Sequence, residues 1–158
     1  MVQGMPLGIL LSAAWVEMLS LEEITDEMAN SLDFLETDLR DVPDHHRSIR
    51  AVFDYSWNLL TLEERDVFAK LSIFRGGFER DAAQKIADAS LRNLTNLTNK
   101  SLRVRDPNGR YWVHKLLQQY AEEKFTSTDE DQNDIHMKHA EYFSKFLTKV
   151  EANFDTKR

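Results

Sequence analysis

The chain has 158 residues, of which 42% are hydrophobic and 10% aromatic, and it contains no cysteine. This size and apolar content indicate one ordinary domain, or a small domain with helical extensions. They exclude a disordered chain, and the missing cysteines exclude disulfides, thiolate catalysis and cysteine zinc sites. The formal net charge of −7 disfavours non-specific binding to nucleic acids or membranes, and the composition fits a cytoplasmic protein.

The N-terminal part is predicted to form two helices and a connector. Pro6 stands at the first position of an apolar helix, where its missing N–H would have no helical partner. The apolar run ends at Val16 and is too short for a membrane span, which takes about 20 residues. Ser20 and Glu23 form a capping box for the second helix. The predicted core residues of that helix are Leu21, Ile24 and Met28.

A longer unit begins near Ser48 with apolar residues at helical spacing, which predict a series of short helices. Thr61 and Glu64 form a second capping box, and Gly76-Gly77 marks a turn that needs a positive φ. The residues expected to face the core are Ile49, Val52, Phe53, Trp57, Leu60, Val67, Phe68, Leu71, Ala82, Ala83, Ile86, Ala87, Leu91, Leu94 and Leu97.

A hairpin is predicted after these helices. Asp106-Pro107-Asn108-Gly109 is a strong turn signal, and inward and outward residues alternate from Leu102 to Arg105 and again from Arg110 to Val113. Helices followed by such a hairpin have the order of a winged helix-turn-helix. A further helix from His114 to about Phe125 closes the unit. Its expected inward residues are Leu117, Tyr120, Ala121 and Phe125.

The C-terminal part is predicted to be a polar loop over residues 126–134 and then one helix. Because its stripe is too apolar to stand alone, we expect this helix to pack on the preceding unit or on a partner. The stripe contains Ile135, His139, Tyr142, Phe143, Phe146, Leu147 and Val150. The predicted fold class is therefore mainly α, with a winged helix-turn-helix carrying a small two-stranded β wing. An N-terminal helical segment and a C-terminal helix flank it.

Four stretches carry a resemblance to a known family: Ser48–Trp57, Leu71–Phe78, Asn99–Leu102 and Tyr111–Ala121. Together they resemble the winged-helix part of bacterial STAND ATPases, the signal-transduction relatives of plant and animal NB-ARC proteins. Gly4-Met5-Pro6-Leu7 is similar to the Gly-x-Pro element that begins their helical lid. The resulting division is a helical lid segment and linker over 1–46, a winged-helix domain over 47–126, and a C-terminal helix over 127–158 that could begin a helical-repeat region.

The resemblance implies a regulatory function. This region would fold over a nucleotide-binding domain of the same protein, sense bound ADP or ATP, and control an on/off switch in signalling or transcription. The phosphate-binding pattern Gly-x-x-x-x-Gly-Lys-Ser/Thr is absent from the sequence, so we expect this chain not to be an enzyme itself and not to hold nucleotide tightly. ADP or ATP would be a cofactor of the full-length protein, and other subunits of an oligomer are further expected partners.

The sharpest candidate residue is His114, where the second strand gives way to a helix. A helix N-terminus has N–H groups and a partial positive charge that suit an anion, and an imidazole there can add a donor. The resemblance implies that His114 contacts the β-phosphate of ADP, that Pro6 packs on the adenine and ribose, and that Gly4 lets the backbone approach. The family usually has an acid after this histidine, whereas this chain has Lys115.

Two alternatives stay open from the residues alone. Six basic residues and one acid, Asp106, lie between residues 91 and 115, which is typical of a DNA-binding winged helix. The candidate DNA contacts are Arg92, Lys100, Arg103, Arg105 and Arg110. We rank DNA binding below docking onto a nucleotide-binding domain, because the rest of the chain is acidic. The third alternative is a protein-interaction scaffold built on the first and last helices.

Metal binding and catalysis are weakly indicated. His45-His46 lies in a polar connector without a carboxylate at helical spacing, so a solvated linker is the preferred interpretation. His136 and His139 have usable spacing on the last helix but no evident third ligand, and His139 is expected in the core. No catalytic dyad or triad is recognisable, because the carboxylates are spread over helix surfaces and caps.

Overall fold

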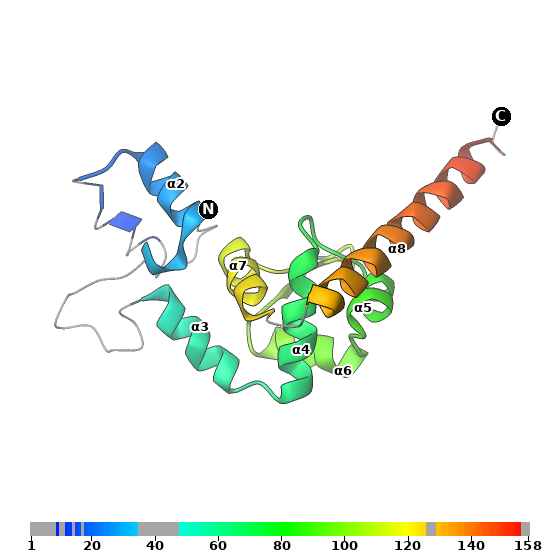
Figure 1. Ribbon diagram of the computed structural model, residues 1–158, viewed down its shortest axis with the longest axis horizontal. Coiled ribbons are helices and arrows are strands. Elements are labelled where there is room, and N and C mark those ends of the chain that lie inside the picture. Colours follow the sequence, from blue (N-terminus) through cyan, green and yellow to red (C-terminus); the bar gives the residue numbers. More distant parts are fainter. Residues whose placement is uncertain are drawn as a thin grey trace.

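The computed structural model describes residues 9, 12–13, 15–16, 18–34, 48–125 and 129–155 (Figure 1). The described chain is mainly helical, as predicted. The N-terminal elements are α2 (Leu21–Asn30) and the 3₁₀ turn η1 (Leu32–Phe34), followed by α3 (Ile49–Asn58), α4 (Leu62–Lys70) and the 3₁₀ turn η3 (Leu71–Ile73). The remaining elements are α5 (Arg80–Ala87), α6 (Leu91–Asn99), β1 (Val104–Arg105), β2 (Tyr111–Trp112), α7 (Lys115–Lys124) and α8 (Asp129–Asp155).

Both predicted capping boxes are confirmed. The Ser20 side chain accepts from the Glu23 N–H while the Glu23 carboxylate accepts from the Ser20 N–H, and Thr61 and Glu64 repeat the arrangement at the start of α4. Each box satisfies donors that a helix N-terminus leaves unpaired. The two signals therefore fixed the starts of α2 and α4 correctly.

The core lies among the helices from α3 to α7, with α4 in contact with α5, α6 and α7 (Figure 1). The predicted inward residues Phe53, Phe68, Ile86 and Leu97 are buried there. The expectation was wrong for Leu21 and Leu91, which are 73% and 52% exposed. Each is the first residue of its helix, so its side chain lies ahead of the turn that packs on the core.

The hairpin pairs β1 with β2 in antiparallel register, Val104 opposite Trp112 and Arg105 opposite Tyr111. Gly109 closes its turn with φ +86°, a conformation that favours glycine. A contact that the sequence did not predict anchors the hairpin to the chain after η3. The Phe78 N–H donates to the Tyr111 carbonyl at 2.9 Å and the Tyr111 N–H donates back at 2.8 Å. The hairpin is thus fixed to the helical body.

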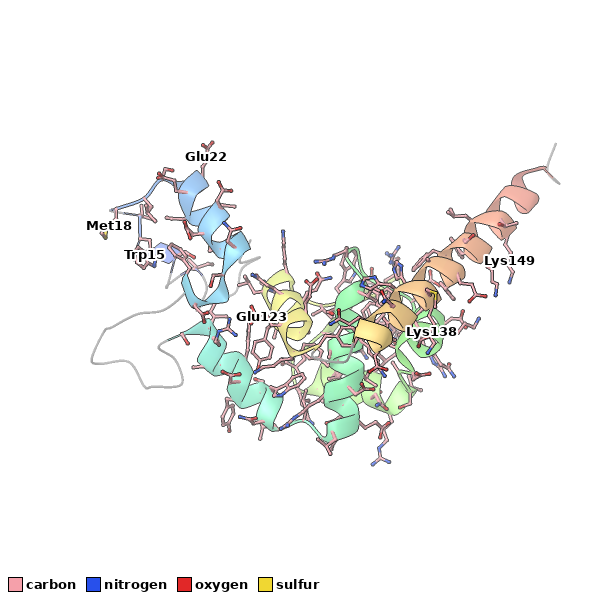
Figure 2. All side chains as sticks on the ribbon, in the orientation of Figure 1. Trp15, Met18, Glu22, Glu123, Lys138 and Lys149 are labelled. Atoms are coloured by element: carbon pink, nitrogen blue, oxygen red, sulfur yellow. The ribbon has the colours of Figure 1, made fainter. Side chains whose placement is uncertain are left out.

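The described N-terminal segment docks on α3 and α7. Trp15 and Phe34 stack with ring centroids 4.8 Å apart inside the segment. Arg50 on α3 pairs with Asp33 of η1, and its Nη1 donates to the Glu123 carboxylate of α7 at 2.7 Å. Figure 2 shows Met18 and Glu22 at the outer end of this segment and Glu123 on α7. The predicted connector begins near Asn30, and its first residues form the end of α2 and η1, whereas His45 and His46 lie outside the described residues.

Helix α8 packs on α5 and then extends away from the body (Figure 1). Ile135 is buried, whereas Phe146 and Leu147 are 48% and 60% exposed, and Lys149 lies on the projecting part (Figure 2). The predicted loop up to Asp134 was wrong, because the helix already begins at Asp129. Acidic residues stabilise a helix N-terminus, so the acid-rich stretch is compatible with helix. Among the described helices, none combines the length and apolarity of a membrane span.

Candidate phosphate-contacting site

His114 is the N-cap of α7. Its Nδ1 accepts a hydrogen bond from the Leu116 N–H at 3.2 Å, and the residue is half-buried between strand β2 and the helix. Because Nδ1 acts as the acceptor, a neutral ring carries its proton on Nε2, which is then a donor. The imidazole therefore combines a helix-capping role with a donor beside the positive end of the α7 dipole.

Helix α7 is fixed by contacts on several sides. Leu116 and Tyr120 are almost fully buried. The Gln118 side chain, 7% exposed, donates to the carbonyls of Ser72 and Phe74 at 2.8 and 2.9 Å. Sequence reasoning missed this buried polar residue, because a glutamine on an amphipathic helix normally faces solvent. The sequence feature that could have indicated its burial is its position beside Leu117, one of the predicted inward residues of this helix. These contacts set the position of His114 relative to the core.

Tyr120 also links α7 to α3 at the far end. Its hydroxyl donates to the Asp54 carboxylate at 2.6 Å, and Lys124 lies 3.2 Å from the same carboxylate. Burial and the Asp54 bond raise the pKa of Tyr120. Burial alone would raise the pKa of Asp54, but the bonds from Tyr120 and Lys124 outweigh it and lower that pKa. These groups hold α7 against α3.

Two of the candidate DNA contacts are engaged inside the molecule. Arg103 is 4% exposed, its Nε donates to the Leu94 carbonyl at 2.8 Å, and its guanidinium lies 3.9 Å from the Tyr111 ring centroid. Burial lowers the pKa of Arg103 to about 10. The Lys100 ammonium donates to Glu64 at 2.7 Å. Neither side chain is therefore positioned to contact a DNA phosphate.

The other three candidate arginines lie at the surface. Arg92 is exposed on α6. Arg105 has its guanidinium 5.8 Å from the Tyr111 ring centroid, and Arg110 donates to the carbonyls of Gly76 and Gly77 at 3.3 Å. The structure therefore does not bring the five residues together as one basic surface.

Asn93 and Asn96 of α6 face α4, whereas Asn99 at the end of the helix is exposed. The Asn93 amide donates to Glu63 at 2.9 Å and the Asn96 amide donates to Glu64 at 2.8 Å. Although burial alone would raise the pKa of Glu64, the bonds from Lys100, the Thr61 N–H and Asn96 lower it to about 2. This polar seam between α4 and α6 was not foreseen, because asparagines at that spacing also fit a solvated face.

The remaining predicted candidates do not form a ligand site in the described chain. Gly4 and Pro6 lie outside the described residues. His139 lies between the rings of Phe74 and Phe143, at 5.6 and 4.7 Å, and burial together with the charge of His136 lowers its pKa. Within the described ranges no three His, Cys or acidic side chains gather as metal ligands.

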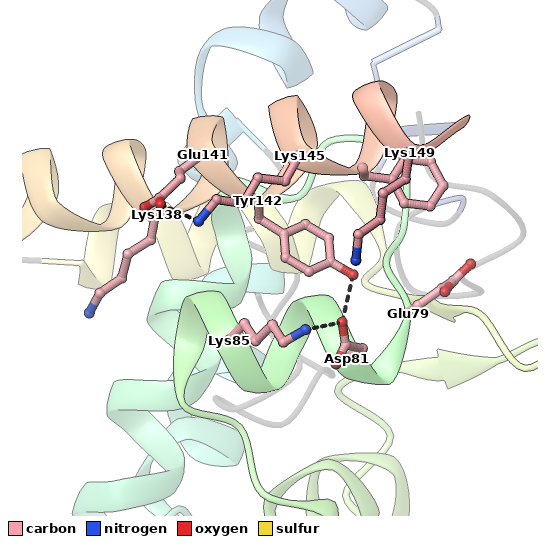
Figure 3. Close-up of a pocket in the computed structure, with 9 residues that line it drawn as sticks. Glu79, Asp81, Lys85, Lys138, Glu141, Tyr142, Lys145 and Lys149 are labelled. Carbon is pink, nitrogen blue, oxygen red and sulfur yellow. Dashed lines mark hydrogen bonds and ion pairs between the residues drawn. The ribbon is translucent and has the colours of Figure 1, made fainter. Parts of the chain in front are cut away.

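A groove of about 480 Å³ lies between α5 and α8 (Figure 3). Several of its polar and charged groups are paired. Asp81 accepts from the Tyr142 hydroxyl at 3.0 Å and from Lys85 at 2.9 Å, and Lys145 pairs with Glu141 on α8. Of these bonds, the one from Tyr142 to Asp81 joins α8 to α5, and we assign the groove to the joint between the two helices.

Comparisons with known proteins point to regulators. No family model matches the chain. The chain is 31% identical over 164 aligned residues to "Putative HTH-type transcriptional regulator Rv0890c" of Mycobacterium tuberculosis and to the similarly named Mb0914c of Mycobacterium bovis. The alignment covers 98% of this chain and 18% of each relative, so the chain spans less than a fifth of their length.

One solved structure resembles the fold. It is a Signal Transduction ATPase with Numerous Domains (STAND) protein with a tetratricopeptide repeat sensor, PH0952 from Pyrococcus horikoshii. The TM-score is 0.53 at 20% identity, over 85% of this chain and 21% of that one. The chain is therefore similar in sequence to proteins named as transcription regulators and similar in fold to part of a STAND protein.

Proposed function

We propose that this chain is the regulatory arm of a STAND-type, NB-ARC-like NTPase and senses whether a neighbouring module holds ADP or ATP. The fold likeness to a STAND protein and the names of the curated relatives support a regulatory role. In this proposal, helices α4 to α6 and the β1–β2 hairpin form a winged helix-turn-helix. Residues 1–46 provide the helical lid and linker.

The observation that carries the proposal is the position of His114 at the junction of hairpin and helix. A neutral imidazole with Nδ1 bonded to the Leu116 N–H would offer Nε2–H to a phosphate oxygen. The α7 dipole favours an anion at that end, and Lys115 adds a positive charge where the family usually has an acid. A nucleotide phosphate is the ligand that this combination fits best.

The proposed on/off switch requires that ADP and ATP stabilise the closed arm to different extents. If the closed arm contacts the β-phosphate of ADP through His114, ADP stabilises the closed form, and exchange for ATP releases the arm. Pro6 and Gly4 are proposed to contact the adenosine part of the nucleotide. The released surface would support oligomerisation or output, and the protein would act in the cytoplasm with ADP or ATP as its cofactor.

Two substitutions of His114 in the full-length protein separate its possible roles. His114→Ala removes both the cap and the phosphate donor, whereas His114→Asp keeps a good cap but places a negative charge toward the phosphate. We expect ADP binding to weaken roughly ten- to a hundredfold in both variants, the loss of one charge-assisted hydrogen bond. Basal output should rise. Equilibrium titration with ADP and an output assay measure the two effects.

The matched control is His136→Ala on the exposed face of α8, which should leave ADP binding at the wild-type value. Unchanged ADP affinity in His114→Asp would show that His114 only caps α7 and would remove the sensor role. The coding sequence provides a second check. The proposal requires a phosphate-binding loop upstream of residue 1, and a full-length protein without one contradicts it.

DNA binding is the second candidate, because the curated relatives are named as helix-turn-helix transcriptional regulators. Arg92, Arg105 and Arg110 are the exposed cations that could contact phosphates. If DNA binding is the function, a gel-shift should strengthen as salt falls, and Arg105→Ala should reduce the slope of log affinity against log salt by about one. The absence of any shift at low salt would remove this candidate.

A further inference from the structure

An aromatic cluster around His139 joins α8 to the helical body. The His139 ring lies 5.6 Å from the ring of Phe74, which follows η3, and 4.7 Å from the ring of Phe143, one turn further along α8. Phe74 is buried and the imidazole is half-buried. A hollow of about 250 Å³ beside this cluster is lined by the same three rings and by Gly76 and Gly77. The joint therefore contains, among apolar contacts, a side chain that titrates near neutral pH.

The body presents charged groups toward α8 from two elements. After η3, Arg75 lines the same hollow as His139 and pairs with Glu122 of α7 at 2.7 Å. On α5, Asp81 accepts from the Lys85 ammonium at 2.9 Å. The other charged side chains on that side, all exposed to solvent, are Glu79, Arg80 and Asp88. The charged group of the body that shares the hollow with His139 is thus a cation.

The charges on α8 itself give a protonated His139 no favourable partner. His136 lies one turn before His139 and is exposed. The neighbouring charges are engaged in two ion pairs along the helix, Lys138 with Asp134 and Lys145 with Glu141. An imidazolium at position 139 would therefore be partly desolvated beside a cation of the body and a second imidazole.

The stability of the joint should consequently depend on pH. Burial, followed by the charge of His136, lowers the pKa of His139 below its ordinary value of 6.5. When α8 leaves the body the ring becomes solvated, and it then binds a proton more readily. Docking of α8 keeps its full stability above pH 6.5 and weakens as the pH falls below that value, because the released state takes up more protons.

We propose that His139 makes the joint between α8 and the body sensitive to acid, so that a neutral imidazole holds α8 in place and an imidazolium releases it. This device goes beyond the proposed nucleotide sensor and does not require it. Release would uncover Phe74, whose carbonyl accepts from the Gln118 side chain of α7 at 2.9 Å. The joint therefore borders the helix that His114 caps.

Amide hydrogen exchange of the complete chain, without nucleotide, tests the joint. Each rate is divided by the intrinsic exchange rate at the same pH, so that only the opening of structure is compared. Between about pH 7.5 and about pH 5.5, the protection of residues 135–143 should fall at least about twofold more than that of residues 62–70 in α4. Equal changes in the two segments would overturn the proposal. Stronger protection of α8 in acid would also overturn it, and would show that the two phenylalanine rings stabilise an imidazolium.

Two substitutions test whether His139 is the group responsible. His139→Gln and His139→Phe keep the side chain neutral at every pH, so the protection of α8 should change with pH no more than that of α4. The comparison is made between pH values within one variant, so a loss of packing in the variant does not obscure it.

The matched control is His136→Gln, which removes the neighbouring exposed imidazole and should retain the acid-dependent loss of protection in α8. If the loss persists in His139→Gln and disappears in His136→Gln, His139 is not the group that titrates and the proposal is wrong. None of these outcomes depends on whether His114 contacts a phosphate.

Discussion

Glu64 shows how one carboxylate serves two elements. It is 4% exposed and accepts from the Thr61 N–H at 2.9 Å, from the Asn96 amide at 2.8 Å and from the Lys100 ammonium at 2.7 Å. The first bond caps α4 and the other two join α4 to α6. A buried charge with this many partners stabilises the fold only while it is ionised.

Glu64→Gln should therefore destabilise the chain in a pH-dependent way. The pKa of Glu64 falls from 4.5 to about 2 on folding, so its contribution is complete above pH 4.5 and is lost as the pH falls toward 2. At pH 7 the free energy of unfolding should drop by about 2–3 kcal/mol, and near pH 2 the variant and wild type should differ little. Urea unfolding at both pH values measures this.

The control is Glu63→Gln, since Glu63 bonds only Asn93 among the hydrogen bonds found in the described chain. Its effect should be small at both pH values. If Glu64→Gln lowered the free energy of unfolding equally at pH 7 and near pH 2, the shape of the Glu64 side chain, and not its charge, would stabilise the polar seam between α4 and α6.

Single residues were partly predictable from the sequence. His114 could be placed because a strand, a junction and a helix follow one another in an unambiguous pattern. Arg103 could not, because strand alternation predicts an outward side chain, whereas the ladder begins only at Val104. The chain before it is free to turn the guanidinium inward to the Leu94 carbonyl.

At the scale of elements, Arg50 joins three parts of the chain. It lies on α3 and pairs with Asp33 of η1 and with Glu123 of α7. All three side chains are partly exposed, with relative areas of 28%, 62% and 40%, so each pair contributes little to global stability. Their effect should fall on the local attachment of the N-terminal segment.

Arg50→Met should release the N-terminal segment more than it destabilises the whole. We expect a loss of at most about 1 kcal/mol in the free energy of unfolding. Amide exchange in α2 should accelerate severalfold, because residues 21–30 lose part of their attachment to the body. Hydrogen exchange with mass spectrometry resolves the two effects.

Arg75→Met is the control. Arg75 pairs with Glu122, which lies on α7 beside Glu123, but it does not contact the N-terminal segment. Identical exchange in α2 for both variants would contradict this role of Arg50.

Elements were well predicted where a local chemical signal marks their ends. Capping boxes fixed the starts of α2 and α4, and the Asp106–Gly109 turn fixed the hairpin. The start of α8 was missed because acidic residues suit both a solvated loop and the first turn of a helix. The pairing of Phe78 with Tyr111 joins residues distant in sequence, and no local pattern encodes it.

At the scale of the whole molecule, the N-terminal segment and the projecting part of α8 lie on opposite sides of the helical body (Figure 1). The predicted domain boundaries separate residues 127–158 from the predicted winged-helix domain over residues 47–126. However, the first half of α8 covers Phe74, which is 5% exposed and lies 5.6 Å from the His139 ring. Helix α8 therefore contributes to the same core.

Truncation at residue 126 should accordingly lower stability. Removing α8 uncovers Phe74 and deletes the buried Ile135, so the thermal midpoint should fall by at least about 5 °C relative to the complete chain. Differential scanning calorimetry measures the shift. A truncation at residue 148 keeps the packed half of α8 and should retain the midpoint. An unchanged midpoint after the first truncation would make residues 127–158 a separate unit.

The central claim is that the His114 imidazole faces a diphosphate held by a neighbouring module. A structure of the full-length protein with ADP bound tests it most directly, through the distance from His114 Nε2 to the nearest phosphate oxygen. We predict a hydrogen-bond distance of about 2.7–3.2 Å between these two atoms. A nucleotide whose phosphates are contacted only from other parts of the protein, with His114 facing solvent, would contradict it.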